Sequence, residues 1–174
     1  MRQVGTSMLM YADDNDSSYP TNGTSQNSFT WDDHLAGYDE RTLSSSQITD
    51  KKLKGSDFGY NSAVYACPDD KAERTYGTDK NVLTKSYALT KRVNSPNASH
   101  KYVRVWARGI SNNTYSAKMS AINKTSSSIA MVKNAHNNSM LGRFTRGTLS
   151  SGDMSNGATL HEGLDGSNYL MVDN

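Results

Sequence analysis

Acidic and amide side chains gather near the start of the chain, where residues 13–16 read Asp-Asp-Asn-Asp. Closely spaced carboxylates are typical ligands of Ca²⁺, which prefers oxygen. An EF-hand loop beginning at Asp14 needs Gly at its sixth position and Glu at its twelfth, but Tyr19 and Ser25 stand there. The alternative is that these side chains bond to nearby backbone and end a helix, which requires a donor to compensate the unfavourable helix dipole. We favour helix termination over a metal site.

A serine-histidine-aspartate set can be drawn from the last residues, in which His161 precedes Asp173. No Gly-x-Ser-x-Gly elbow is present, and Ser is so frequent that a chance triad is expected. The other histidines, His34, His100 and His136, are scattered and lack zinc-site spacing. We therefore expect a protein that is not an enzyme, with no catalytic, cofactor-binding or metal-binding residues.

The segment "KYVRVWAR" places Tyr102, Arg104, Trp106 and Arg108 on one face of an expected strand. Aromatic and Arg side chains on a sheet can stack single-stranded bases, or the face can be solvated or covered by another protein. The chain has 19 basic and 17 acidic residues and a net charge of +2, which is too weak a field to attract nucleic acid. We expect a protein-contact face and no nucleic-acid partner.

The composition is that of a single domain with a thin core. The chain has 174 residues, of which 34% are hydrophobic, and ten Tyr and eight Met argue against disorder. The single cysteine, Cys67, excludes an internal disulfide and a cysteine-based zinc cage, and it suits a small buried position. No 18-residue apolar run is present. We expect one domain over residues 1–174.

The first residues have a helical pattern. Val4, Met8 and Tyr11 are spaced at i, i+4 and i+7, which predicts an amphipathic helix from residue 1 to about 13 or 14. No capping residue precedes this pattern. We therefore expect it to be the C-terminal half of a longer helix.

Residues 15–60 are predicted to be a polar loop with a short helix. Thr30 is followed three positions later by Asp33, which is the spacing of a capping box, and Trp31 begins an apolar face. This pattern predicts a short helix there. A further helical turn is expected over residues 51–54.

Residues 61–174 change to a period of two. Short runs rich in Val, Ile, Tyr and Leu are bounded by turn residues, with no alternation of helix and strand. The sequence predicts an α+β fold in which the N-terminal helix packs against a small antiparallel sheet. The expected strands cover residues 62–67, 86–91, 102–108, 128–133, 140–145 and 168–173.

The opening stretch resembles prepilin-type proteins, in particular the pseudopilins of type II secretion. In that family, helix residues lead into a Tyr, an Asp-Asn pair and then Tyr-Pro. Here Tyr11, Asp14, Asn15, Tyr19 and Pro20 supply the pattern. One more residue separates Asn15 from Tyr19 than is usual in the major pseudopilin.

Further segments resemble the same family in the same order. "TWDDHLAGYDE" looks like its short helix bearing Trp31, and "VYACPDD" looks like its Cys-Pro-Asp element with Cys67 and Pro68. "KSYALT" is similar to its Ser-Tyr strand and contains Tyr87. The resemblance therefore spans nearly the whole chain.

The end of the chain resembles the family's closing motif, in which a His precedes an Asp-Gly pair. Here His161 precedes Asp173 by a longer gap, and Asn174 stands in the place of Gly. Major secretion pseudopilins bind Ca²⁺ in a C-terminal loop, but Asp153, Asp165 and Asp173 match that spacing poorly. The resemblance implies no cofactor beyond an unsupported Ca²⁺ site.

The resemblance implies a pilin-like fold and a structural function. A leader cleaved by a prepilin peptidase and an apolar helix of about 20 residues are expected before this segment, so that the chain meets the membrane only through that missing helix. Cys67 is expected to pair with an upstream cysteine. The expected partners are other pilin or pseudopilin subunits and a secreted substrate, in a type II secretion-like or type IV pilus-like filament.

The expected location is the bacterial cell envelope. The subunit is anchored in the inner membrane with its head in the periplasm, or lies in an extracellular filament. The alternative is a stand-alone envelope or secreted module that binds polysaccharide or an exported protein through the face around Tyr102 and Trp106.

Overall fold

The structure, a computed structural model, has helices in the first part of the chain and strands in the second, which confirms the predicted α+β class. The residues that it describes are 1–23, 29–50, 60–91, 109–113, 115–122, 128–134, 136–144, 147–149 and 169–172. In chain order the elements are α1 (Arg2–Asp14), α2 (Trp31–His34), α3 (Ser45–Asp50), the 3-10 helix η1 (Tyr60–Tyr65), β1 (Tyr87–Thr90), the 3-10 helix η2 (Met119–Ala121), β2 (Ile129–Lys133), β3 (Thr148–Leu149) and β4 (Tyr169–Met171).

Helix α1 presents one face to the interior, as its sequence pattern predicted. Val4, Met8 and Ala12 follow one another at intervals of four and are buried, with exposed fractions of 0%, 2% and 0%. Met10 lies on another side of the helix and is 49% exposed. Within the described ranges, none of the helices combines the length and apolar character that a membrane crossing needs.

The short helix α2 forms where the capping pattern predicted it. The backbone N–H of Thr30 donates to Asp33 Oδ2 over 2.9 Å, which is one of the two bonds of a capping box. Trp31 and Leu35 bury their side chains beneath this turn.

Helix α3 was not predicted, although the sequence carries a signal for it. Ser44 and Gln47 have the spacing of a second capping box, and the Ser44 backbone N–H donates to Gln47 Oε1 over 2.8 Å. The predicted turn at residues 51–54 lies outside the described residues.

The sheet has four strands in the order β3-β1-β2-β4. Strands β1, β2 and β4 pair antiparallel and fall within the predicted runs 86–91, 128–133 and 168–173, with Leu89 opposite Met131. The prediction of a wholly antiparallel sheet is wrong, because β3 pairs with β1 in parallel. A long stretch of chain separates Thr90 from Thr148, so it can return in either direction, whereas a tight hairpin imposes antiparallel pairing.

Two of the predicted strands are wrong. Residues 62–67 were expected to be extended, but η1 occupies most of this run. The period of so short a run cannot tell a strand from a helix. Pro68, which directly follows the run, lacks the N–H that a strand ladder needs. In the predicted run 140–145, Met140 forms only an isolated bridge with Thr84, and a turn follows in which Gly142 adopts φ of 72°. The predicted strand at 102–108 lies outside the described residues.

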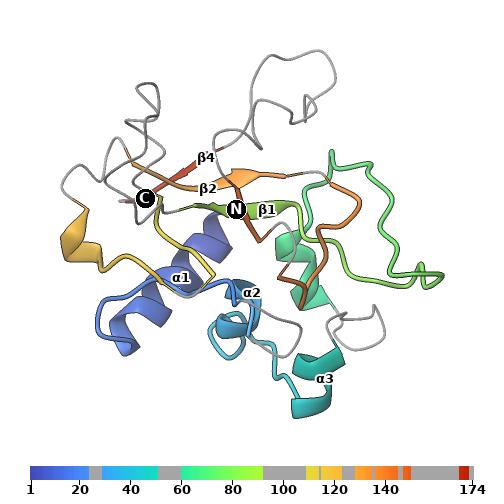
Figure 1. Cartoon of the computed structure of the whole chain (residues 1–174), viewed down its shortest axis with the longest axis horizontal. Helices are drawn as coiled ribbons and strands as arrows, with labels where there is room; N and C mark the ends of the chain where they lie inside the picture. The colour runs from blue at the N-terminus through green and yellow to red at the C-terminus, as the bar shows by residue number, and fades with distance from the viewer. Residues whose placement is uncertain are drawn as a thin grey trace.

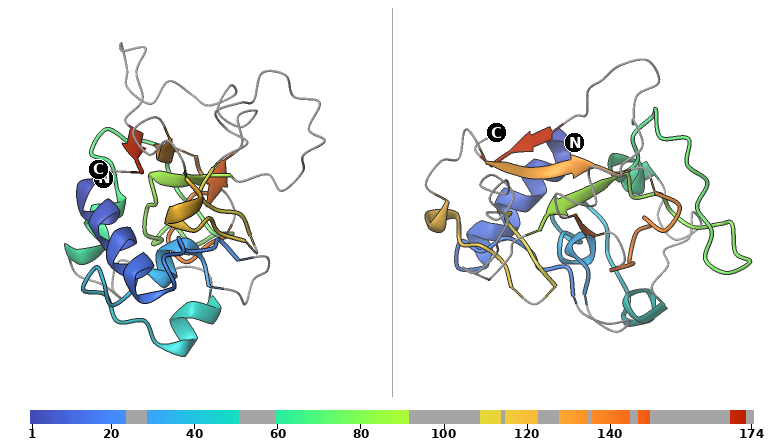
Figure 2. Two further views of the ribbon diagram at one scale, coloured as in Figure 1. Left: turned by 90° about the vertical axis from the view of Figure 1, so that its left-hand side faces the viewer. Right: turned by 45° about the horizontal axis from the view of Figure 1, so that its top comes forward.

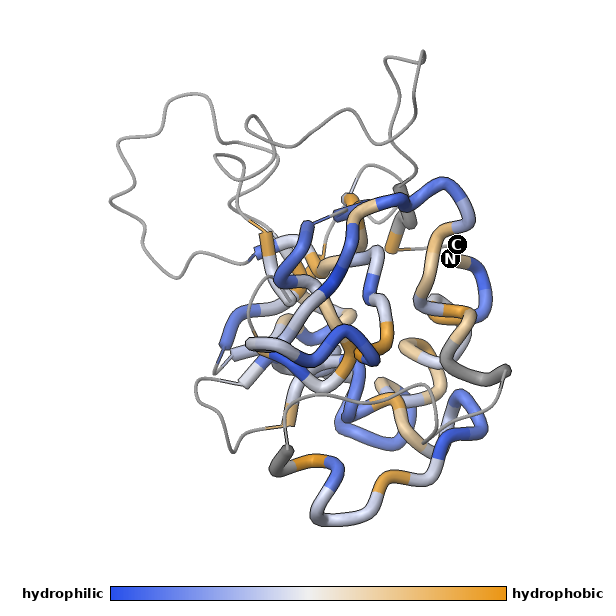
Figure 3. The backbone as a smooth tube through the Cα atoms, turned by 90° about the vertical axis from the view of Figure 1, so that its right-hand side faces the viewer, coloured by the Kyte–Doolittle hydropathy of each residue, from blue (hydrophilic) through white to orange (hydrophobic). Residues whose placement is uncertain are grey.

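The helices and the sheet share one main hydrophobic core. Figure 1 shows α1, α2 and α3 on the same side of the sheet, and Figure 2 shows α1 beside the sheet from two further directions. The hydrophobic segments along the chain are short and separated by hydrophilic ones (Figure 3). The buried members of the main core are Val4, Met8, Tyr19, Trp31, Leu35, Tyr65, Cys67, Tyr87, Leu89, Ile110, Ala117, Ala130, Met131, Leu141 and Val172.

A smaller apolar cluster forms around other residues of the same strands. Ala88 and Val132 are paired across β1 and β2, and they pack with Leu149 of β3 and with Ile129. Because alternate residues of a strand point to opposite faces, β1 contributes Leu89 to the main core and Ala88 to the smaller cluster. Apolar side chains of the sheet are therefore buried in two separate clusters.

Replacing Gly147 with Ala tests how tightly the entry to β3 is packed. A Cβ at this position would lie 1.7 Å from Oδ1 of Asn22, a side chain that is 1% exposed and donates through Nδ2 to the Phe144 carbonyl over 2.7 Å. We expect Gly147→Ala to lower the free energy of unfolding by about 1–3 kcal/mol in urea denaturation. In an Asn22→Ala background the cost should shrink, and an equal cost in both backgrounds would contradict this packing.

Candidate functional site

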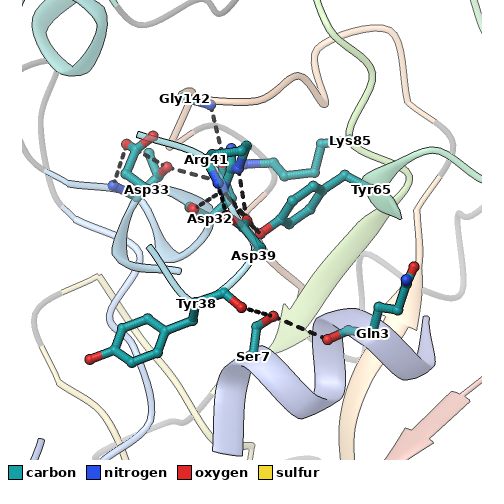
Figure 4. A network of polar contacts seen from close by, with 11 residues as sticks. Gln3, Ser7, Asp32, Asp33, Tyr38, Asp39, Arg41, Tyr65, Lys85 and Gly142 are labelled. Atoms are coloured by element: carbon teal, nitrogen blue, oxygen red, sulfur yellow. Dashed lines mark hydrogen bonds and ion pairs between the residues drawn. The ribbon is translucent and has the colours of Figure 1, made fainter. Parts of the chain in front are cut away.

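A fully buried ion pair joins α2 to the residues just before β1 (Figure 4). Lys85 Nζ lies 2.6 Å from Asp32 Oδ1, and both side chains have an exposed fraction of 0%. The ammonium also lies 5.6 Å from the centre of the Trp31 ring. The pair therefore sits in an interior where water does not screen it.

Each polar atom of this pair has further partners. Asp32 Oδ1 also accepts from the Thr30 hydroxyl over 2.9 Å, and Oδ2 accepts from the Gly142 backbone N–H over 2.7 Å. Lys85 Nζ donates a second hydrogen bond to the Arg143 carbonyl over 2.9 Å. We call Thr30, Asp32, Asp33, Lys85 and Gly142 the Asp32 cluster.

A second ion pair adjoins this cluster. Arg41 Nε donates to Asp39 Oδ2 over 2.7 Å, and the Tyr65 hydroxyl donates to the same oxygen. The Arg41 guanidinium lies 4.5 Å from the centre of the Tyr65 ring and donates to the backbone carbonyl of Asp32. Arg41 thereby connects the loop after α2 to both η1 and the Asp32 cluster.

The pKa values of the two neighbouring carboxyls of α2 are shifted in opposite directions. Burial alone would raise the pKa of Asp32, but the charges of Lys85 and Arg41 and the hydrogen bond from Gly142 hold it below its ordinary value. Burial, followed by the negative charge of Asp32, raises the pKa of Asp33 to about 6. Asp33 Oδ1 is buried without a hydrogen-bond partner. Asp32 is thus a carboxylate at neutral pH, and Asp33 is a weak acid.

The Cys-Pro-Asp element builds another buried group, which we call the Asp70 cluster (Cys67, Asp70, Arg74 and Ser86). Arg74 donates two parallel hydrogen bonds to Asp70, of 2.7 Å from Nη1 to Oδ1 and 2.5 Å from Nη2 to Oδ2. The Ser86 hydroxyl donates to Asp70 Oδ2 over 2.5 Å and accepts from the Cys67 N–H over 2.9 Å. This element is therefore fastened to the start of β1.

The acidic stretch at residues 13–16 ends α1, as predicted. The Asn15 side chain donates to the Tyr11 carbonyl over 2.7 Å, and α1 stops at Asp14. The donor that the helix dipole requires is the Tyr38 hydroxyl, which lies 3.0 Å from Asp14 Oδ2. Asp16 instead pairs with Lys118 across the chain.

The described residues contain no group of three or more His, Cys, Asp or Glu side chains placed to hold a metal ion. A surface hollow of about 470 Å³ lies between α1, the loop after α2 and η1. Among its lining residues, Asp39 is already bonded to Arg41 and Tyr65. The hollow is lined by Gln3, Thr6, Ser7, Tyr38, Asp39, Glu40 and Val64.

Five of the residues that carry the family resemblance lie in or against the main core. Tyr19, Trp31, Cys67 and Tyr87 are buried in it, and Tyr11 packs against it. Pro20 is also buried, and its carbonyl accepts a hydrogen bond from Ser111 over 2.7 Å. Pro68 is exposed. The predicted residues that lie outside the described ranges are His100, Tyr102, Arg104, Trp106, Arg108, Asp153, His161, Asp165 and Asp173.

Sequence reasoning missed the charged members of these clusters. Lys85, Arg41 and Arg74 are buried, although such side chains are usually exposed. The one available signal was position, because Lys85 and Ser86 directly precede Tyr87 in the segment that carries the resemblance.

Comparison of the chain with protein-family models, with curated proteins and with solved structures found no match. The interpretation of the site therefore rests on its own geometry.

Replacing Asp33 with Asn tests the raised acidity of this carboxyl. Because the pKa of Asp33 is about 6 in the folded state and 3.8 ordinarily, the folded chain holds the extra proton, and stability falls as pH rises through this window. The neutral amide does not titrate, so the stability of Asp33→Asn relative to the parent should rise by roughly 2–3 kcal/mol between pH 4 and pH 7. Urea unfolding at four pH values measures this.

The control is Glu73→Gln, which removes a carboxylate whose side chain is 72% exposed. Its profile should run parallel to that of the parent, and a parallel profile for Asp33→Asn would refute the assignment.

Replacing Arg74 with Met tests the Asp70 cluster. The side chains of Arg74 and Asp70 are 2% and 0% exposed, so the change leaves a buried carboxylate without its cation and should cost roughly 3–5 kcal/mol. The matched control is Lys80→Met, which removes the cation of an exposed pair with Glu73 at 3.2 Å. That change should stay within about 0.5 kcal/mol in the same denaturation assay. Equal costs would show that the buried pair is not a structural requirement.

Proposed function

We propose that this chain is the globular head of a pilin-like filament subunit, of the pseudopilin kind, and that it acts by assembly and not by catalysis. The observation that carries the proposal is that five of the resemblance residues meet in one core. Tyr11, Tyr19, Trp31, Cys67 and Tyr87 come from widely separated segments, yet they pack in the cluster that joins α1 to the sheet. Residues buried in the core help to determine the fold. Their position there supports the pilin-like fold that the resemblance implies.

The two faces of α1 support the same role. Val4, Met8 and Ala12 bind the helix to its own domain, whereas Met10 is 49% exposed and available to a neighbour. In the proposed filament an apolar helix continues α1 on its N-terminal side, lies in the inner membrane before assembly, and packs with its copies afterwards. The energy of polymerisation then comes from burying that helix and from contacts between heads.

The partners in this proposal are other pilin or pseudopilin subunits, with the head in the periplasm or on an extracellular filament. Cys67 is 7% exposed, and it lies near enough to the amino group of Met1 to act on the pKa of that group, which burial lowers. An upstream cysteine on the continued helix would approach Cys67 from this side. No metal or cofactor is needed for the role.

The alternative is a stand-alone module that binds an exported protein or a polysaccharide. A row of rings favours contact with some partner: Phe29, His34, Tyr11 and Tyr38 follow one another at centroid distances of 5.4, 5.5 and 5.9 Å, and Phe29 is 45% exposed. Their interplanar angles of 28°, 58° and 79° do not give a flat platform for sugar rings. Side chains of another protein fit this surface better.

Cysteine cross-linking in the cell of origin tests the proposal. Met10→Cys places a thiol on the exposed face of α1 in the full gene product, and Cys67→Ser removes the native thiol from the same background. A bis-maleimide reagent joins two thiols, so a single cysteine in each subunit can give only dimers, and we expect a strong cross-linked dimer in the envelope fraction. The matched control is Lys80→Cys in the same background, on a residue whose side chain is 75% exposed and far from α1 in sequence, which should give much less of the cross-linked dimer.

Two results would overturn the filament role. One is that the Met10→Cys and Lys80→Cys variants both stay monomeric after cross-linking in intact cells. The other is a coding sequence whose residues before Met1 form a plain secretion signal in place of an apolar helix that continues α1. Either result would favour the binding module.

A further inference from the structure

The Asp32 cluster contains a nucleophile and an electrophile in contact. Lys85 ends in a primary amine, Asp32 ends in a carboxyl group, and Nζ lies 2.6 Å from Oδ1 with no exposed surface on either side chain (Figure 4). We propose that the two side chains condense into an intramolecular isopeptide bond, an amide between Nζ of Lys85 and Cγ of Asp32. The bond would close a ring between residues that are 53 positions apart.

The geometry favours this reaction because the reacting groups are already held together. Asp32 is fixed on α2 by Thr30 and Gly142, and Lys85 is fixed by the Arg143 carbonyl. An amine and a carboxyl held in contact react as if at very high concentration, since the entropy of bringing them together has been lost during folding. The burial of the pair also keeps water from hydrolysing the product.

The surrounding hydrogen bonds match the amide as well as they match the ion pair. After condensation, Oδ2 becomes the amide oxygen and keeps the N–H of Gly142, 2.7 Å away. The single remaining N–H on Nζ keeps the Arg143 carbonyl, 2.9 Å away. The same Gly142 N–H would stabilise the negative charge on Oδ2 in the tetrahedral intermediate. The product thus leaves neither buried group unsatisfied and removes two buried charges, which are costly to desolvate.

The atoms balance without any other reactant. The Lys85 ammonium carries three protons: one stays on the amide nitrogen, and two leave with Oδ1 of Asp32 as water. The bond formed is Nζ–Cγ, and the bond broken is Cγ–Oδ1. The Thr30 hydroxyl lies between the departing oxygen, at 2.9 Å, and Asp33 Oδ2, at 2.8 Å. This hydroxyl can therefore pass a proton from Asp33 to the leaving oxygen. It can later return to Asp33 a proton that the Lys85 nitrogen has lost.

The acidity of the neighbours sets the rate. Lys85 and Arg41 hold Asp32 ionised, so the amine becomes nucleophilic only when a proton passes from Lys85 to the carboxylate. The bond should form slowly in the folded chain. Because the pKa of Asp33 is raised to about 6, this relay acid is protonated at pH 5 and ionised at pH 8. Condensation should therefore be faster at pH 5.

Intact-mass spectrometry of the folded, purified chain tests the bond directly. We expect a mass lower than that of the sequence by one water molecule, and a branched peptide joining the segments of Asp32 and Lys85 after proteolysis. Lys85→Arg keeps a cation beside Asp32 but cannot form this amide, so it should show the full sequence mass. A water loss that persists in Lys85→Arg would indicate a succinimide and would overturn the proposal.

A second series separates reaction from folding. Asp33→Asn interrupts the relay while keeping the hydrogen bonds of Asp32 to Thr30 and Gly142, and it should slow the mass change at least several-fold at pH 5, with circular dichroism showing that the fold is kept. The slowing should be smaller at pH 8, where Asp33 is already ionised. The full sequence mass in the folded parent chain after prolonged incubation at pH 5 would refute the bond. Neither outcome depends on the filament role.

Discussion

The ion pair between Asp32 and Lys85 is the interaction on which the arrangement of the domain depends. It joins α2 to the start of β1, and Gly142 and Arg143 bring a third segment to the same point. A chain that is only 34% hydrophobic has few apolar side chains with which to hold three segments together. Directional polar contacts in a water-free interior supply that connection, and they do so only because the polar atoms of this pair find partners.

The two residues before Tyr87 divide this task. Lys85 binds Asp32, whereas its neighbour Ser86 binds Asp70, so one dipeptide connects the Asp32 and Asp70 clusters to β1. Tyr87 then enters the main hydrophobic core. Such clusters cost more to desolvate than an apolar core of the same volume, and in return they accept one geometry and reject others. The position of β1 is therefore specified by charge, and its burial is supplied by apolar contact.

The sequence predicted the parts of the fold that depend on local pattern. The spacing of Val4 and Met8 located α1, the Thr30 capping box located α2, and the β-branched and aromatic runs located β1, β2 and β4. It failed where long-range pairing decides the structure, because the parallel partner of β1 is a two-residue strand with no period of its own. The buried charges were missed for a related reason. Lysine is a residue type that usually lies at the surface, and only the fold shows that Asp32 lies against Lys85.

The location of these clusters indicates which surfaces are left for the proposed function. The Trp-Asp-Asp and Cys-Pro-Asp segments contribute Asp32 and Asp70 to buried contacts, and the Lys-Ser-Tyr segment contributes their partners Lys85 and Ser86. Residues that are saturated by internal bonds are not available to a ligand, so recognition by this chain falls to surfaces outside them. Exposed Met10 on α1 and Phe29 at the end of the aromatic row are such surfaces. In the proposed filament, a subunit pulled through its N-terminal helix would transmit that load through the buried face of α1 into the main core, which also contains Trp31 and Tyr87. The segments that carry those two residues are tied together by Asp32 and Lys85, so a covalent bond between them would strengthen the domain at the point where such a load enters the sheet.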